Sequence, residues 1–127
     1  MKYLAVDFGL KHLGVAISEG ELAEPLAEKK YSSETEGLSW LSRMAEEQAA
    51  EKIIFGLPEG NLAETVKNFA KKLGEVTGKE IIFQDETLST VEAKQKLLEA
   101  GKPLEKRRLD HRASAALILQ DYLDSIK

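Results

Sequence analysis

The sequence predicts one α/β domain in which a mixed sheet of five strands carries helices on both faces. Two observations lead to this fold class. The first strands follow one another as a hairpin, and the later strands alternate with amphipathic stretches of helical spacing. The length of 127 residues suits one core, and 43% hydrophobic with 31% charged residues is ordinary for a globular protein. We therefore expect a single domain over residues 1–127.

The N-terminal part is expected to form three strands. Residues 2–7 are a short apolar run that ends at Asp7 and is followed by a turn over residues 8–11. Apolar side chains then alternate over residues 13–17, which predicts a strand that returns antiparallel to the first. A third strand is expected over residues 24–31.

Helices and strands alternate in the middle of the chain. Ser33 and Glu36 have the spacing of a capping box, which predicts a helix that runs to about Ala49. The run Ile53-Ile54-Phe55 predicts a central strand, and Gly56-Leu57-Pro58 ends it.

A second helix is expected after this strand. Asn61 and Glu64 repeat the capping pattern at its start, and Gly74 or Gly78 is expected to end it. Its core face is predicted from apolar residues at helical spacing, namely Leu62, Val66, Phe69, Ala70 and Leu73.

The last third is expected to add one strand and two helices. A strand over residues 81–83 ends in two carboxylates, Asp85 and Glu86. A helix over residues 89–101 and a final helix over residues 109–125 follow. The sheet-facing side of the final helix is expected to consist mainly of small residues: Ala113, Ala116, Leu117, Leu119 or Gln120, and Leu123.

Composition excludes some classes of site and leaves one basic patch as a candidate nucleic-acid-binding surface. The chain has no cysteine, so disulfides, thiolate metal sites and a cysteine nucleophile are excluded. The N-terminus lacks the apolar length of a signal peptide or a membrane span, so we expect a cytoplasmic protein without membrane association. The net charge of -4 argues against binding nucleic acid through overall charge, so local patches matter. The densest basic patch, which could equally be a solvated surface, comprises Lys102, Lys106, Arg107, Arg108 and Arg112.

Two carboxylates are expected to meet at one edge of the sheet. If the first, fourth and fifth strands are parallel neighbours, Asp7 and Glu86 lie together at their carboxyl ends. Two close carboxylates need a cation between them, and oxygen ligands suit Mg²⁺ or Mn²⁺. The alternative is that Asp7 only begins a turn and Glu86 is a surface charge.

Other catalytic motifs are missing from the sequence. It contains no Walker motif, no Gly-x-Gly-x-x-Gly and no Ser-His-Asp or His-Glu-x-x-His arrangement. Asp7-Phe8-Gly9 with Gly14 resembles the phosphate hairpin of actin-like ATPases, but those proteins close two lobes over a nucleotide and this chain has the length of one.

Four motifs in this order resemble the YqgF family, also called Holliday-junction-resolvase-like, from end to end. They are Asp7-Phe8-Gly9-Leu10-Lys11 with Gly14-Val15-Ala16, then Gly56-Leu57-Pro58, then Asp85-Glu86-Thr87-Leu88-Ser89-Thr90, and finally Ala115-Ala116-Leu117-Ile118-Leu119-Gln120-Asp121-Tyr122-Leu123. The resemblance implies an RNase H-like fold and a metal-dependent nuclease that matures the 5′ end of pre-16S rRNA, with Holliday junction resolution as an older proposal. It also implies that Asp7 and Glu86 are site carboxylates and that Lys11 lies near phosphate.

The sequence departs from the family pattern at the third acid. An ungapped alignment from the tail places His111 where the family usually has aspartate, with Asp110 one residue earlier. A neutral imidazole can still ligate a metal or shuttle a proton. Asp110 can instead be the N-cap of the final helix, and His111 a surface residue. Thr87 replaces a common arginine, and the segment after Pro58 is shorter than usual.

The leading hypothesis is a nuclease for structured RNA. Asp7 and Glu86 would hold Mg²⁺ or Mn²⁺, His111 or Asp110 would complete the shell, and water would attack phosphorus. The backbone of the RNA would be steered by Lys11, Arg107, Arg108 and Arg112. The partners implied are precursor rRNA or branched DNA and a ribosomal precursor particle. A non-catalytic RNA- or ribosome-binding module and a nucleotide-binding relative of actin-like ATPases are the rivals.

Overall fold

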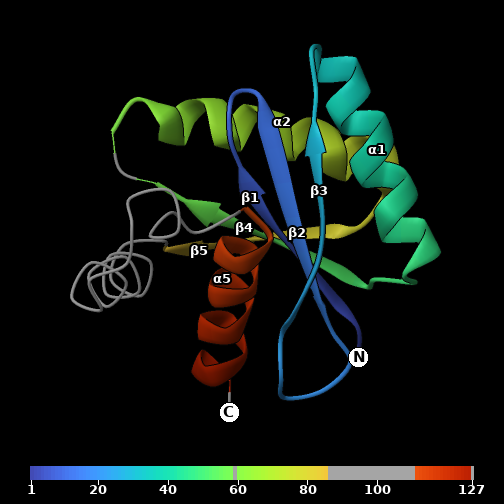
Figure 1. The fold of residues 1–127 in the computed structure, drawn as a ribbon, viewed down its shortest axis with the longest axis vertical. Helices are drawn as coiled ribbons and strands as arrows, with labels where there is room; N and C mark the ends of the chain where they lie inside the picture. The colour runs from blue at the N-terminus through green and yellow to red at the C-terminus, as the bar shows by residue number, and fades with distance from the viewer. Residues whose placement is uncertain (59, 86–110, 127) are drawn as a thin grey trace, which may run out of the picture.

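A computed structural model describes residues 1–58, 60–85 and 111–126 (Figure 1). Its elements, in chain order, are β1 (Tyr3–Phe8), β2 (His12–Ser18), β3 (Glu24–Lys30), α1 (Glu34–Glu47), β4 (Lys52–Leu57), α2 (Leu62–Thr77), β5 (Glu80–Asp85) and α5 (His111–Ser125). The helix expected over residues 89–101 lies outside the described residues. Of the helices described, none combines the length and apolar character that crossing a membrane requires.

The five strands form one mixed sheet in the order β3-β2-β1-β4-β5. β2 pairs antiparallel with both β1 and β3, whereas β4 lies parallel to β1 on one side and to β5 on the other. The prediction that the first, fourth and fifth strands are parallel neighbours is therefore confirmed. Their carboxyl ends share one edge of the sheet, which we call the carboxyl edge, and β3 also ends there because it runs in the direction of β1.

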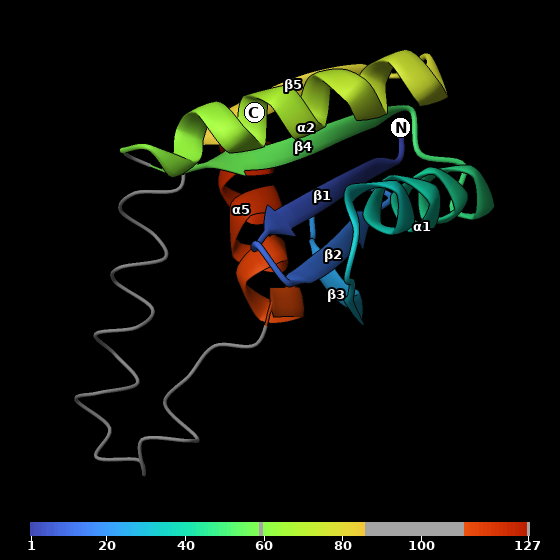
Figure 2. The same ribbon diagram turned by 90° about the horizontal axis from the view of Figure 1, so that it is seen from above.

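Helices cover both faces of the sheet, as Figures 1 and 2 show. The alternation of side chains along β1 separates two cores, because Leu4 and Val6 point to α1 and α2 whereas Ala5 points to α5. The core between the sheet and α5 is thin at its centre, where the small side chains of Ala5 and Ala16 face the helix. Small side chains there let α5 lie close to the strands.

The helix ends confirm one of the two capping patterns predicted within the described residues, and a third, Ser89 with Glu92, lies outside them. Ser33 has extended backbone angles, and its hydroxyl accepts a hydrogen bond from the Glu36 amide at 3.2 Å. Asn61 makes no such bond, so that prediction was wrong. Its φ of -66° and ψ of -27° are already helical, whereas a capping side chain acts from extended backbone. The second helix ends at the later glycine, since Gly78 adopts a left-handed φ of 70° that favours glycine.

The sheet-facing side of α5 was only partly predicted. Leu119 and Leu123 are buried as expected, but Ala113, Ala116 and Leu117 are only half-buried. The residues that are buried on this helix are Ser114, Ala115, Ile118, Leu119 and Leu123. Periodicity did not select this side because apolar residues occur all round the helix over residues 113–119.

Candidate active site

Asp7 lies at the carboxyl edge on the side of the sheet covered by α5. It is two residues after Ala5, which packs against α5, so alternation along β1 directs Asp7 to the same side. Its partner across the β1–β2 pair is Gly14. The side chain of Asp7 is 13% exposed, so it is largely shielded from water while remaining accessible from the edge.

His111 is the residue that the structure brings to Asp7. The Nδ1 atom of His111 lies 3.0 Å from Oδ2 of Asp7, although 104 positions separate the two residues in the chain. The His111 side chain is 30% exposed. The imidazole rings of His12 and His111 stack with centroids 5.4 Å apart and planes 9° from parallel. His111 is therefore held between a carboxylate and a second ring.

Gly14 permits this approach because it has no side chain. A Cβ atom at position 14 would lie 2.1 Å from both the carbonyl carbon and the carbonyl oxygen of His111. Such distances are far below van der Waals contact, and backbone atoms cannot move aside as the end of a side chain can. The start of α5 thus lies directly against the strand. A glycine inside the alternating pattern of this strand was the available signal for close backbone approach.

The turn between β1 and β2 is fixed by a hydrogen bond within it and by two from Tyr31, which directly follows β3. The Gly9 amide donates to the His12 carbonyl at 2.8 Å. The Tyr31 hydroxyl donates to the Gly9 carbonyl at 2.5 Å, and the Tyr31 amide donates to the Lys11 carbonyl at 3.0 Å. Burial, and secondarily the charge of Glu34, raise the pKa of Tyr31, so the hydroxyl keeps the proton it donates. Sequence reasoning did not identify Tyr31 or His12 as part of this region.

Of the residues predicted to contact nucleic acid, Lys11 and Arg112 lie within the described structure. Lys11 is exposed in the turn that follows β1, four residues after Asp7. Arg112 follows His111 on α5, and its Nε lies 3.6 Å from Oε1 of Glu28 on β3. Part of its charge is therefore balanced within the protein. Glu86, Arg107, Arg108 and Asp110 lie outside the described residues.

The described residues at this site offer two potential metal ligands, one carboxylate and one imidazole. Among residues 1–58, 60–85 and 111–126, His, Asp and Glu side chains form no group of three or more that could hold a metal. Asp7 and His111 offer one carboxylate oxygen and one imidazole nitrogen at 3.0 Å. The carboxylate of Asp7 fits Mg²⁺ or Mn²⁺, whereas the imidazole of His111 is a ligand type more typical of softer ions such as Zn²⁺.

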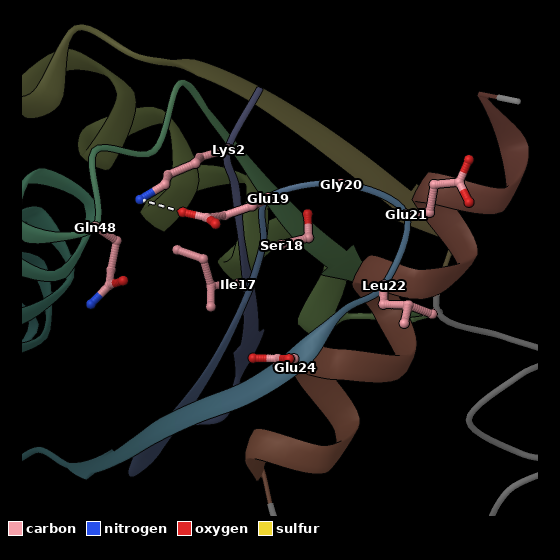
Figure 3. Close-up of a pocket in the computed structure, with 9 residues that line it drawn as sticks. All are labelled: Lys2, Ile17, Ser18, Glu19, Gly20, Glu21, Leu22, Glu24 and Gln48. Carbon is pink, nitrogen blue, oxygen red and sulfur yellow. Dashed lines mark ion pairs between the residues drawn. The ribbon is translucent and has the colours of Figure 1, made fainter.

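The opposite edge of the sheet has a different electrostatic character. A cavity of about 510 Å³ there is lined by Glu19, Glu21 and Glu24 from the β2–β3 connection and the start of β3 (Figure 3). Lys2 reaches Glu19 at 2.8 Å, and its hydrogen bond lowers the pKa of that carboxyl. An edge with this many carboxylates disfavours phosphate.

Comparison with known proteins decides the family. A family model described as RuvX, Holliday junction resolvase, matches residues 1–125. The chain belongs to the RuvX family. A Lactococcus lactis subsp. lactis protein named "Putative pre-16S rRNA nuclease" is 34% identical, with 98% of this chain and 94% of the relative covered. A Syntrophus aciditrophicus protein of the same name is 36% identical, with 99% and 90% covered. The family predicted from the motifs is therefore confirmed, and it is a family of nucleases.

Solved structures show the same fold for this RuvX-family protein. Thermus thermophilus RuvC in complex with a Holliday junction substrate matches with a TM-score of 0.70 and 15% identity, covering 99% of this chain and 95% of that one. The Fowlpox virus resolvase, bound to Holliday junction DNA, matches with a TM-score of 0.64 and 13% identity, covering 99% of both chains. The predicted RNase H-like fold is confirmed.

Proposed function

We propose that this RuvX-family protein is a divalent-metal-dependent nuclease that cleaves precursor rRNA at the 5′ end of 16S rRNA. The observation that carries the proposal is the 3.0 Å contact between Asp7 and His111 at the carboxyl edge. It joins the first strand of the sheet to the final helix, and both residues stay partly accessible. The names of the relatives from Lactococcus and Syntrophus support the choice of RNA. A precursor rRNA substrate implies action in the cytoplasm on a ribosomal precursor particle.

Asp7 and His111 are the described residues that would hold Mg²⁺ or Mn²⁺, with Glu86 as the proposed third ligand. Such an ion supplies positive charge that offsets the negative charge of the phosphodiester as the bond breaks. Lys11 is exposed in the adjoining turn, where its ammonium can contact the phosphate backbone. The hydrogen bonds that Tyr31 makes to this turn set the position of Lys11.

Proton transfer is the alternative role for His111, because an Nδ1 atom that ligates a metal ion carries no proton to donate to Asp7. When its proton is on Nδ1, the imidazole donates to Asp7 and leaves Nε2 as an acceptor. Asp7 then fixes the orientation of the ring, and stacking on His12 restricts its rotation. An oriented neutral imidazole can take a proton from attacking water at Nε2. This use of His111 preserves a function at the position where the family usually has an aspartate.

Cleavage of a precursor rRNA by an Asp7→Asn variant tests the proposal. Asparagine keeps the size of the side chain but removes its charge, so we expect kcat/KM to fall by about 100-fold or more while the circular dichroism spectrum is unchanged. The matched control is Asp124→Asn, the same substitution at an exposed position near the far end of α5. Full activity of Asp7→Asn in the presence of Mg²⁺ would refute the role of this carboxylate.

The same assay distinguishes the rival functions when a four-way DNA junction is included as a second substrate. Cleavage of precursor rRNA in preference to the junction supports the proposal. Cleavage of the junction alone would overturn the choice of RNA. Binding of precursor rRNA without cleavage in either Mg²⁺ or Mn²⁺ would instead favour a non-catalytic RNA-binding module.

A further inference from the structure

A groove lies at the carboxyl edge on the side of the sheet opposite to the contact between Asp7 and His111. It has a volume of about 520 Å³ and lies between the β1–β2 turn, the segment that joins β3 to α1, and the first half of α2. Phe8 lines it, and Phe8 follows Asp7 directly on β1 with side chains on opposite faces. Consecutive Cα atoms are about 3.8 Å apart, so the groove begins within one residue of Asp7.

The floor of the groove is apolar and partly aromatic. Phe8 and Phe69 pack with ring centroids 4.8 Å apart, and the ring of Tyr31 contributes to the wall. Leu10 also lines the groove, and its side chain is 69% exposed. Flat aromatic and apolar walls suit the face of an unpaired base, which a duplex would keep hidden in its stack.

The rim of the groove carries positive charge. Lys11 and Lys30 both line it and both are exposed. The one carboxylate of its lining, Glu34, lies 2.7 Å from the ammonium of Lys72, so its charge is paired. The surplus is therefore basic, in contrast with the acidic cavity at the other edge of the sheet (Figure 3). A polyanion with exposed bases matches both the floor and the rim.

We infer that this groove binds an unpaired nucleotide of the substrate strand beside the scissile phosphate, with the base on Phe8, Leu10 and Tyr31 and the backbone phosphate at Lys11 and Lys30. This inference rests on the proposed function, because it places the nucleotide next to the phosphate that is cleaved at Asp7. The strand crosses the carboxyl edge at the β1–β2 turn and has one neighbouring nucleotide on each face of the sheet. The substrate at the cut is thereby single-stranded on one side.

Binding of a fluorescein-labelled ten-nucleotide oligoadenylate RNA, measured by anisotropy in EDTA to prevent cleavage, tests the groove. We expect Leu10→Ala and Lys30→Ala each to weaken binding about fivefold or more. Lys30→Ala is also expected to reduce the slope of log K against log salt by about 0.7, the value for one phosphate contact on a single strand. The matched controls are Leu22→Ala in the acidic cavity and Lys71→Ala on α2 outside the groove, both at exposed positions. The controls are expected to bind as the unmodified protein does.

A ¹⁵N–¹H spectrum recorded during titration with the same RNA gives a second measurement and reports folding of each variant. Shifts confined to the amides of residues 8–11, 30–34 and 65–69 support the groove. Unchanged affinity in both groove variants, or shifts confined to the acidic cavity, would overturn it. If the groove variants weaken RNA binding but the unmodified protein cleaves nothing, the groove stands as an RNA-binding site and the proposed function fails. If precursor rRNA is cleaved at full rate by both groove variants with unchanged KM, the groove alone is refuted.

Discussion

Replacing Gly14 by alanine would place a methyl group where the backbone of His111 lies. The added Cβ would be 2.1 Å from the carbonyl carbon and oxygen of His111, which is 1.3 Å short of the 3.4 Å at which ordinary contact begins. The neighbouring atoms are main chain, so relief requires movement of the start of α5 or of β2. A shift of this size would carry the 3.0 Å contact between Asp7 and His111 out of hydrogen-bonding range.

We therefore expect Gly14→Ala to lower both stability and activity. Overpacking costs about 1–3 kcal/mol when side chains can adjust, and this site should reach the upper end because a helix must move. The free energy of unfolding, measured by urea titration, should fall by about 3 kcal/mol, and cleavage of precursor rRNA should fall with it in the fraction that remains folded.

The control for this substitution is Gly20→Ala. A Cβ at position 20 meets nothing within 4 Å, so this variant should change the free energy of unfolding by less than about 1 kcal/mol. If Gly14→Ala were as stable and as active as the unmodified protein, the close contact between β2 and α5 would not exist in solution. The position of His111 beside Asp7 would then lose its support.

Two further predictions concern the turn and the core. Tyr31→Phe removes the hydrogen bond to Gly9 and should lower the free energy of unfolding by about 0.5–1.5 kcal/mol at pH 8. Because folding raises the pKa of Tyr31, its contribution is complete below the unfolded pKa of about 10 and is lost as pH rises through the folded pKa. The difference between the two proteins, measured by urea titration, should therefore shrink above pH 10, and a constant difference would contradict the role of the hydroxyl proton. Phe55→Ala removes a fully buried ring that packs against Phe69 at a centroid distance of 6.1 Å. Its expected cost is about 3–5 kcal/mol in the same titration, and a cost below about 1 kcal/mol would show that β4 is not central to the core.

Local sequence patterns were sufficient for most of the described elements. The alternation over residues 13–17 predicted the hairpin because side chains of a strand alternate between faces whatever the tertiary context. Ser33 with Glu36 predicted the start of α1 for a similar reason, since the cap is formed within four residues. Asn61 with Glu64 has the same spacing and failed, because the backbone at Asn61 is helical. A pattern of residue types does not specify the dihedral angles that make a cap.

For the candidate site too, the sequence identified some features and left others as predictions. The apolar run and the turn after it identified Asp7 as a carboxylate at the end of a buried strand, and the order of four motifs identified the family. The roles of Glu86, Asp110, Arg107 and Arg108 remain predictions, because these residues lie outside the described structure.

What the sequence by itself determined is local: the strands, most helix boundaries, and the placement of Asp7 at a strand end. Only the tertiary structure decided which side of α5 is buried, that Gly14 lies against His111, and that Tyr31 holds the turn beside Asp7. The physical reason is that these contacts join residues far apart in the chain, where the distance between a glycine and a helix backbone is set by how two elements pack. Asp7 and His111, 104 positions apart, meet because the strand and the final helix share a face of the sheet.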